Sequence, residues 1–165
     1  PGQYPIVRSS DLANKILELD EPKQALLLEW QGKRDDIGAC WYALVDGDIV
    51  IAWEDHSGHN GGSSYDVYAK QFDANGATVI DDFRVNDSFI SDNQYQVAVS
   101  GLTGGGYVIT WRDSGGGSHD DGTGTGSSSD IWAQMYNSDG SVAVSEFRLN
   151  TTLTQSQELP AITLP

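Results

Sequence analysis

Cysteine, basic residues and long apolar stretches are all scarce in this sequence of 165 residues. The single cysteine, Cys40, excludes an internal disulfide and any cysteine-cluster site for zinc, haem or iron–sulfur. Lysine and arginine number 9 against 24 aspartates and glutamates, and the resulting charge of −15 argues against binding nucleic-acid phosphates. No apolar run approaches the roughly 18 residues that span a bilayer, so we expect no membrane insertion.

Glycine and aromatic residues are abundant, with 19 glycines, five tryptophans and seven tyrosines, which indicates a folded chain rather than an acidic disordered one. Almost all the glycine follows residue 35. We therefore divide the chain into an N-terminal lead-in, residues 1–35, and a β-repeat domain, residues 36–165. The lead-in is predicted to be helical or irregular, with a helix capped by Ser10 and Asp11 and a second over 22–31; a short buried strand fits the second segment equally well.

The β-repeat domain contains an internal repeat. Residues 46–53 (DGDIVIAW) match 104–111 (GGGYVITW), and residues 66–76 (DVYAKQFDANG) match 130–140 (DIWAQMYNSDG). The alignment continues through 83–86 and 147–150, and then places 94–100 on 158–164. These matches predict repeat one over 37–86, repeat two over 95–150 and a partial third repeat over 159–165.

Each repeat reads as four short strands separated by glycine, asparagine and aspartate turns. The predicted strands are 37–45, 48–54, 66–73 and 79–86 in repeat one, and 95–102, 106–112, 130–137 and 143–150 in repeat two. The pattern predicts an all-β fold of tandem four-stranded antiparallel units, each like the blade of a β-propeller. A β-sandwich of stacked sheets satisfies the same pattern.

These repeat units resemble the tandem repeats of very large secreted bacterial adhesins and haemolysin-type calcium-binding proteins of type I secretion systems. The matching stretches are 107–111 (YVITW), 131–136 (IWAQMY), 146–151 (EFRLNT) and 159–162 (LPAI), with 67–73 and 83–86 in the first copy. The resemblance implies an extracellular or cell-surface protein, but the tandem GGxGxD nonapeptides of the calcium β-roll are absent. Low cysteine content also suits an exported bacterial protein.

Two acidic, glycine-rich loops join the second and third strands of the repeats, at residues 54–65 and 112–129. Calcium binds six to eight oxygen atoms from carboxylates and carbonyls in such flexible loops. We predict calcium ligands in both loops, with the alternative that the loops are merely solvated; the candidate ligands are Glu54, Asp55, Asp66, Asp113, Asp120, Asp121 and Asp130. All three histidines, His56, His59 and His119, lie in these loops, but their spacing is not typical of a transition-metal site.

No catalytic motif is present, so we expect a non-catalytic structural or adhesion module that binds calcium. The alternatives are a carbohydrate-binding, lectin-like module and an accessory subunit attached to a larger complex through residues 1–35. Expected partners are a protein or glycan ligand, or a second copy bound through the C-terminal strand. Six aromatic residues could stack on sugars: Trp53, Trp111, Trp132, Tyr65, Tyr68 and Tyr136. A core role is favoured over a sugar platform, because Trp53 and Trp111 lie at matching strand ends.

Overall fold

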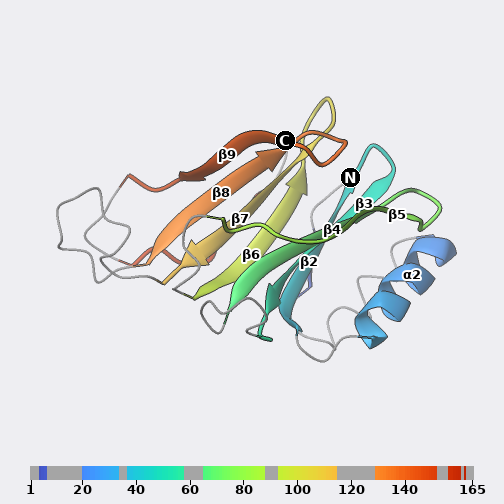
Figure 1. The fold of residues 1–165 in the computed structure, drawn as a ribbon, viewed down its shortest axis with the longest axis horizontal. Helices are drawn as coiled ribbons and strands as arrows, with labels where there is room; N and C mark the ends of the chain where they lie inside the picture. The colour runs from blue at the N-terminus through green and yellow to red at the C-terminus, as the bar shows by residue number, and fades with distance from the viewer. Residues whose placement is uncertain are drawn as a thin grey trace.

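Two antiparallel sheets and one helix form the part of the chain described by the computed structural model, residues 4–6, 20–33, 37–57, 65–87, 93–114, 129–151, 156–160 and 162 (Figure 1). Sheet A has the order β1 (Tyr4–Ile6), β2 (Ile37–Val45), β3 (Asp48–Asp55), β4 (Asp66–Phe72) and β5 (Thr78–Arg84). Sheet B has the order β6 (Gln94–Gly101), β7 (Tyr107–Asp113), β8 (Asp130–Tyr136) and β9 (Val142–Arg148). The predicted all-β class is confirmed, and neither sheet closes on itself.

The strands follow the predicted pattern, and each observed boundary lies within one or two residues of the predicted one. Apolar and β-branched runs form the strands, and the turns fall where glycine supplies a backbone conformation that other residues avoid. Gly76 and Gly140 have φ of 87° and 78° in the turns that lead into β5 and β9.

The main core lies between the two sheets. Alternate residues of a strand face opposite sides of its sheet, so Val50 and Ala52 of β3 face sheet B, where they join a cluster with Ile109 and Trp111 of β7. Ile49, Ile51 and Trp53 of β3 face the other way. The central strand β3 of sheet A is therefore buried on both faces.

Helix α2 (Glu21–Gly32) covers the face of sheet A that lies away from sheet B (Figure 1). Asp20 caps the helix, since its carboxylate accepts a hydrogen bond of 3.1 Å from the Lys23 amide. Leu27 and Trp30 are buried against sheet A, and the ring of Trp30 lies 5.0 Å from that of Trp53. The helix predicted over 22–31 is present, whereas the one predicted from Ser10 lies outside the described residues.

The lead-in also contributes a strand, which the sequence did not predict. β1 pairs with β2, with Tyr4 opposite Tyr42 and Ile6 opposite Cys40. Residues from both ends of the lead-in thus belong to the layers built on sheet A.

The strands of the two sheets pair in corresponding registers. Trp53 opposes Tyr68 between β3 and β4, and Trp111 opposes Trp132 between β7 and β8. The backbone hydrogen bond from Val85 to Val67, of 2.8 Å, has its counterpart in the bond of 2.8 Å from Leu149 to Ile131. Both β2 and β6 carry a bulge near their first residues.

The match predicted for the C-terminal segment is displaced by one residue. The backbone amide of Gln94 donates to the Tyr65 carbonyl at 2.9 Å. The backbone amide of Gln157, not of Glu158, makes the equivalent bond to the Ser129 carbonyl at 2.8 Å. Positive φ of 56° at both Gln96 and Leu159 supports the same alignment. The displacement arises because one residue fewer separates Asn150 from Gln157 than separates Asn86 from Gln94.

Candidate functional site

The predicted calcium ligands at the strand ends face each other in pairs. Asp55 is the last residue of β3 and opposes Asp66, the first residue of β4. Asp113 and Asp130 oppose each other in the same way between β7 and β8. Asp120 and Asp121 lie outside the described residues, so the structure does not place them relative to these pairs.

The carboxylates at the strand ends of sheet A accept hydrogen bonds from other groups of the fold. Asp66 accepts a hydrogen bond of 2.8 Å from the Asn86 amide nitrogen, which also donates to the Gln94 side-chain oxygen at 3.1 Å. Gln94 in turn donates to Asp113 at 3.4 Å. This chain of side chains links the start of β4 to β6 and β7, and therefore connects the two sheets. Asp55 accepts hydrogen bonds from the backbone and hydroxyl of Ser57.

Sheet B repeats part of this arrangement. Asn150 donates to Asp130 at 2.6 Å, and its side-chain oxygen accepts from the Ile131 amide at 2.8 Å, as that of Asn86 accepts from Val67. Arg148 lies 3.7 Å from the same Asp130 carboxylate. These aspartates, predicted from the sequence as calcium ligands, therefore also accept hydrogen bonds that hold the strand ends.

No group of three or more histidine, cysteine, aspartate or glutamate side chains converges on a common point among the described residues. Most of the two acidic loops, where Asp120, Asp121, His59 and His119 lie, is outside the described residues. Calcium in those loops stays a prediction.

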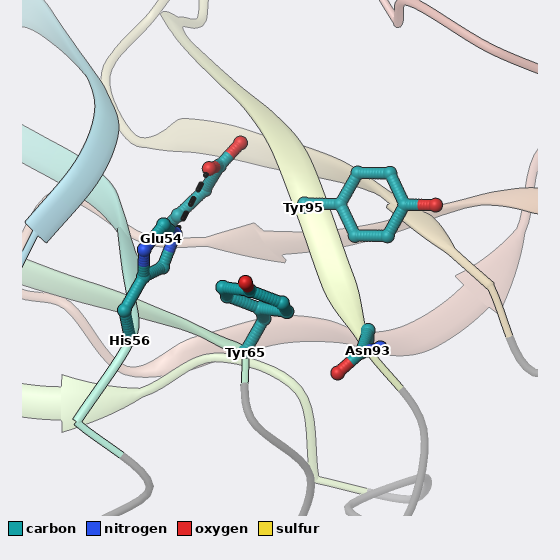
Figure 2. A pocket seen from close by; sticks show the side chains of 5 residues that line it. All are labelled: Glu54, His56, Tyr65, Asn93 and Tyr95. Atoms are coloured by element: carbon teal, nitrogen blue, oxygen red, sulfur yellow. Dashed lines mark hydrogen bonds and ion pairs between the residues drawn. The ribbon is translucent and has the colours of Figure 1, made fainter.

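A surface pocket of about 380 Å³ lies beside the seam between the sheets (Figure 2). Its walls come from the end of β3, the start of β4 and the start of β6, and its lining residues are Glu54, His56, Tyr65, Asn93 and Tyr95. A carboxylate, an imidazole, an amide and two phenols thus share one concave surface.

Contacts within the pocket hold several of its side chains in place. One Glu54 oxygen accepts a hydrogen bond of 2.6 Å from the backbone amide of Gln96, and the other lies 3.4 Å from His56 Nε2. The His56 and Tyr65 rings meet edge to face at 4.3 Å, beside Glu54 in Figure 2. The Arg112 guanidinium lies over the Tyr95 ring at 4.8 Å. The pocket is therefore bordered by rings with fixed orientations.

Cys40, whose thiol is influenced by the pocket carboxylate Glu54, is not available for chemistry. Burial, assisted by the nearby Glu54 carboxylate, raises the pKa of the Cys40 thiol to about 12. A thiol with so high a pKa stays protonated and unreactive at neutral pH. The pocket itself has groups suited to hydrogen bonding and ring stacking.

The sequence identified only part of this pocket. Glu54, His56 and Tyr65 belong to an acidic loop and were considered separately as metal ligands or sugar platforms, while Asn93 and Tyr95 were not considered. Trp53, Trp111 and Tyr136, also considered as sugar platforms, are buried in the core. The mismatch between the two repeats at the lining positions was a usable signal, since Tyr65 corresponds to Ser129.

Comparison of the chain with protein-family models, with curated proteins and with solved structures gives no match. Within the described part of the chain, no helix combines the length and the apolar character needed to cross a lipid bilayer.

Proposed function

We propose that this chain is a non-catalytic adhesion module of an extracellular or cell-surface protein, built from successive blade-like sheets, and that it binds a saccharide in the pocket beside their seam. The observation that carries the proposal is the joint presence of two tyrosines, a histidine, a carboxylate and an amide around a concavity of about 380 Å³. Pockets of this size, with a few convergent polar groups, are the usual sites of small-ligand binding.

The corresponding registers of β2–β5 and β6–β9 support the tandem-repeat part of the proposal. Side chains with the same structural task are retained in both sheets: Asp66 and Asp130 each accept a hydrogen bond from an asparagine, Asn86 and Asn150. Two copies of one structural unit need the same hydrogen bonds, so retention of these pairs is expected of a tandem repeat.

The pocket residues, in contrast, are not retained at the equivalent positions, which supports a specific role for them. The residues at the equivalent positions in and after the second repeat are all different: Arg112, Ser114, Ser129, Ser156 and Glu158. There Arg112 and Glu158 form an ion pair with a separation of 3.2 Å. The blade does not need aromatic rings at these positions, so the rings of the first pocket serve another purpose.

The chemistry of the pocket favours a neutral or cationic saccharide over an anionic one. Aromatic rings present flat apolar faces that suit the C–H face of a sugar, while carboxylate, amide and imidazole groups hydrogen-bond with its hydroxyls. Glu54 and the net charge of −15 disfavour a ligand with its own carboxylate or sulfate.

Glycan-array binding followed by titration calorimetry tests this proposal. Tyr65→Ala removes one ring, and we expect at least a tenfold loss of affinity for the best array ligand. Tyr65→Phe keeps the ring and should retain most of the binding. His56→Gln should weaken binding by a smaller factor, because an amide retains part of the hydrogen bonding.

Val79→Ala, an exposed substitution on β5 outside the pocket, is the control and should leave affinity unchanged. Equal affinities of the wild type and the folded Tyr65→Ala protein would exclude this pocket as the saccharide site. Absence of binding to any glycan would leave only the scaffold function.

Calcium in the acidic loops is a second part of the proposal. The aspartates at the strand ends are engaged with amides and hydroxyls, so the ligands would come chiefly from Asp120, Asp121 and the glycine-rich backbone between them and the strands. Such a site would lie in the loop between β7 and β8, beside the paired Asp113 and Asp130.

A further inference from the structure

We infer that the face of sheet B that lies away from sheet A is a docking surface for a further four-stranded sheet of the same repeat type, joined in sequence through residues 156–162. This inference rests on the proposed repeat organisation and is independent of saccharide binding. It also assigns α2 to the opposite end of the stack, where it takes the place of a preceding sheet.

Corresponding apolar positions on the two sheets differ in side-chain exposure. Val85 follows β5 and is fully buried between the sheets, whereas Leu149, its counterpart after β9, is 47% exposed. Val67 of β4 is fully buried, and its counterpart Ile131 is partly exposed. These positions at the β8 and β9 side are thus covered in sheet A and open in sheet B, whereas Val108 and Thr110 of β7, the counterparts of Val50 and Ala52, are buried in sheet B as well.

In sheet A these positions are covered by the first strands of sheet B. Val67 and Val85 belong to the cluster that includes Val97 and Val99 of β6 and Ile109 of β7. The covering layer is therefore a sheet that presents alternating apolar residues from its first strands. A layer of the same type is the occupant that matches the apolar positions repeated on sheet B.

The described C-terminal segment would enter the proposed further sheet as the chain enters sheet B. Residues 156–160 repeat the path by which the chain enters β6: Gln157 bonds to the Ser129 carbonyl, and Leu159 has the positive φ of Gln96. The Leu159 amide donates to the Gln96 side-chain oxygen at 3.0 Å, and Glu158 pairs with Arg112. The segment already lies against the β6 and β7 end of sheet B in the position of a first strand.

Sheet A does not offer an equivalent surface, because helix α2 packs on its outer face. Trp53, the counterpart of Trp111, is buried against Leu27 and Trp30 of α2, whereas Trp111 is buried against sheet A. Helix α2 therefore takes the place of a neighbouring sheet at this end, as capping elements do in repeat proteins. In the described structure the outer face of sheet A is covered by α2, so a further sheet would be added on sheet B.

Thiol accessibility provides the test, since Cys40 is the only native cysteine and is buried. In the existing chain, Leu149→Cys should react quickly with a maleimide, and Val85→Cys should react at least ten times more slowly. The chain is then extended in register by joining residues 94–165 after residue 156, with Leu149→Cys in the first copy only. Coverage by the added sheet should slow the reaction at least tenfold.

Val79→Cys, on an exposed position of β5, is the control and should stay reactive in both chains. An unchanged rate for Leu149→Cys in a folded extended chain would overturn the proposal. Protection of Leu149→Cys in the existing chain, with sedimentation of a dimer, would also overturn it, because a second copy would then occupy the face.

A truncation supplies a second test that does not depend on folding of the extended chain. Ending the chain at residue 156 removes the segment that bonds to Gln96 and Arg112, so we expect the Tm to fall by several degrees without a change in sedimentation. A truncated protein that melts like the full chain would show that the segment is not seated on sheet B. Fast reaction of Val85→Cys, by contrast, would contradict the repeat organisation itself.

Discussion

At the scale of single residues, buried amide groups determine how the strand ends are held. Asn86 is fully buried and links the Val67 backbone, the Asp66 carboxylate and the Gln94 side chain. Asn150 occupies the corresponding position but is only partly buried. The same side chain thus stabilises the two sheets to different degrees.

We predict that Asn86→Ala lowers the free energy of unfolding by about 3 kcal/mol, because it leaves buried partners unsatisfied at about 1–3 kcal/mol each. Asn150→Ala is the matched control and should cost less, since water can reach its partners. Urea denaturation followed by tryptophan fluorescence measures both. Equal losses would contradict the unequal burial of the two asparagines.

A second residue-scale prediction concerns alkaline pH. Burial, with smaller contributions from the neighbouring Tyr107 and from Asp87 and Glu146, raises the pKa of Tyr136 well above its ordinary value of 10.0. Burial likewise raises the pKa of Tyr107, whose ring stacks on that of Tyr136 with centroids 4.9 Å apart. Unfolding releases both phenols to ionise near pH 10, so the stability that they contribute is complete below about pH 10 and falls above it.

Melting temperatures between pH 8 and 11 should therefore fall steeply above about pH 10 in the wild type. Tyr136→Phe removes one titrating group and should flatten this decline. A Tyr136→Phe protein with the same slope as the wild type would mean that other groups control alkaline unfolding.

At the scale of elements, α2 is a short helix stabilised by its packing against sheet A. Leu27 is 2% exposed and Leu28 is 50% exposed, although they are neighbours in the sequence. Leu27→Ala should cost about 2–4 kcal/mol of unfolding free energy through lost packing and a cavity, whereas Leu28→Ala should cost less than about 1 kcal/mol. Chemical denaturation measures the difference, and similar values for the two substitutions would contradict this placement of α2.

The elements that sequence predicts best are those whose pattern is local. Alternating apolar residues and glycine turns predicted the strands from β2 to β9, and Pro22 near the start of an apolar run predicted α2. β1 was missed because three residues with a central Pro5 carry no strand pattern, and only pairing with β2 makes them a strand.

The candidate site was less predictable for the same reason. Glu54 and Tyr95 are far apart in the sequence, and only the packing of β6 beside β3 brings them into one pocket. The one-residue displacement at Gln157 was also invisible, because the connection between repeats changes length without changing the strand sequences. Contacts between distant segments, rather than local propensity, determine both features.

At the scale of the whole molecule, the net charge of −15 opposes the compact state, because like charges are brought closer together on folding. In the described part of the chain the ion pairs are partly exposed, as those of Lys70 with Asp82 and Arg112 with Glu158 are, so most of this repulsion acts through solvent that salt can screen. The Debye length falls from about 30 Å at 0.01 M ionic strength to about 8 Å at 0.15 M. Salt should therefore stabilise this protein in a general way, whether or not it binds calcium.

We expect the Tm to rise by several degrees between 10 mM and 150 mM NaCl, and more slowly above that, as screening becomes complete. CaCl₂ compared with MgCl₂ at matched ionic strength separates screening from specific binding. A calcium site in the loop between Asp113 and Asp130 should raise the Tm further with CaCl₂ alone and saturably, and Asp120→Asn with Asp121→Asn should abolish only that additional rise. Equal effects of the two salts would restrict the acidic loops to a solvating role.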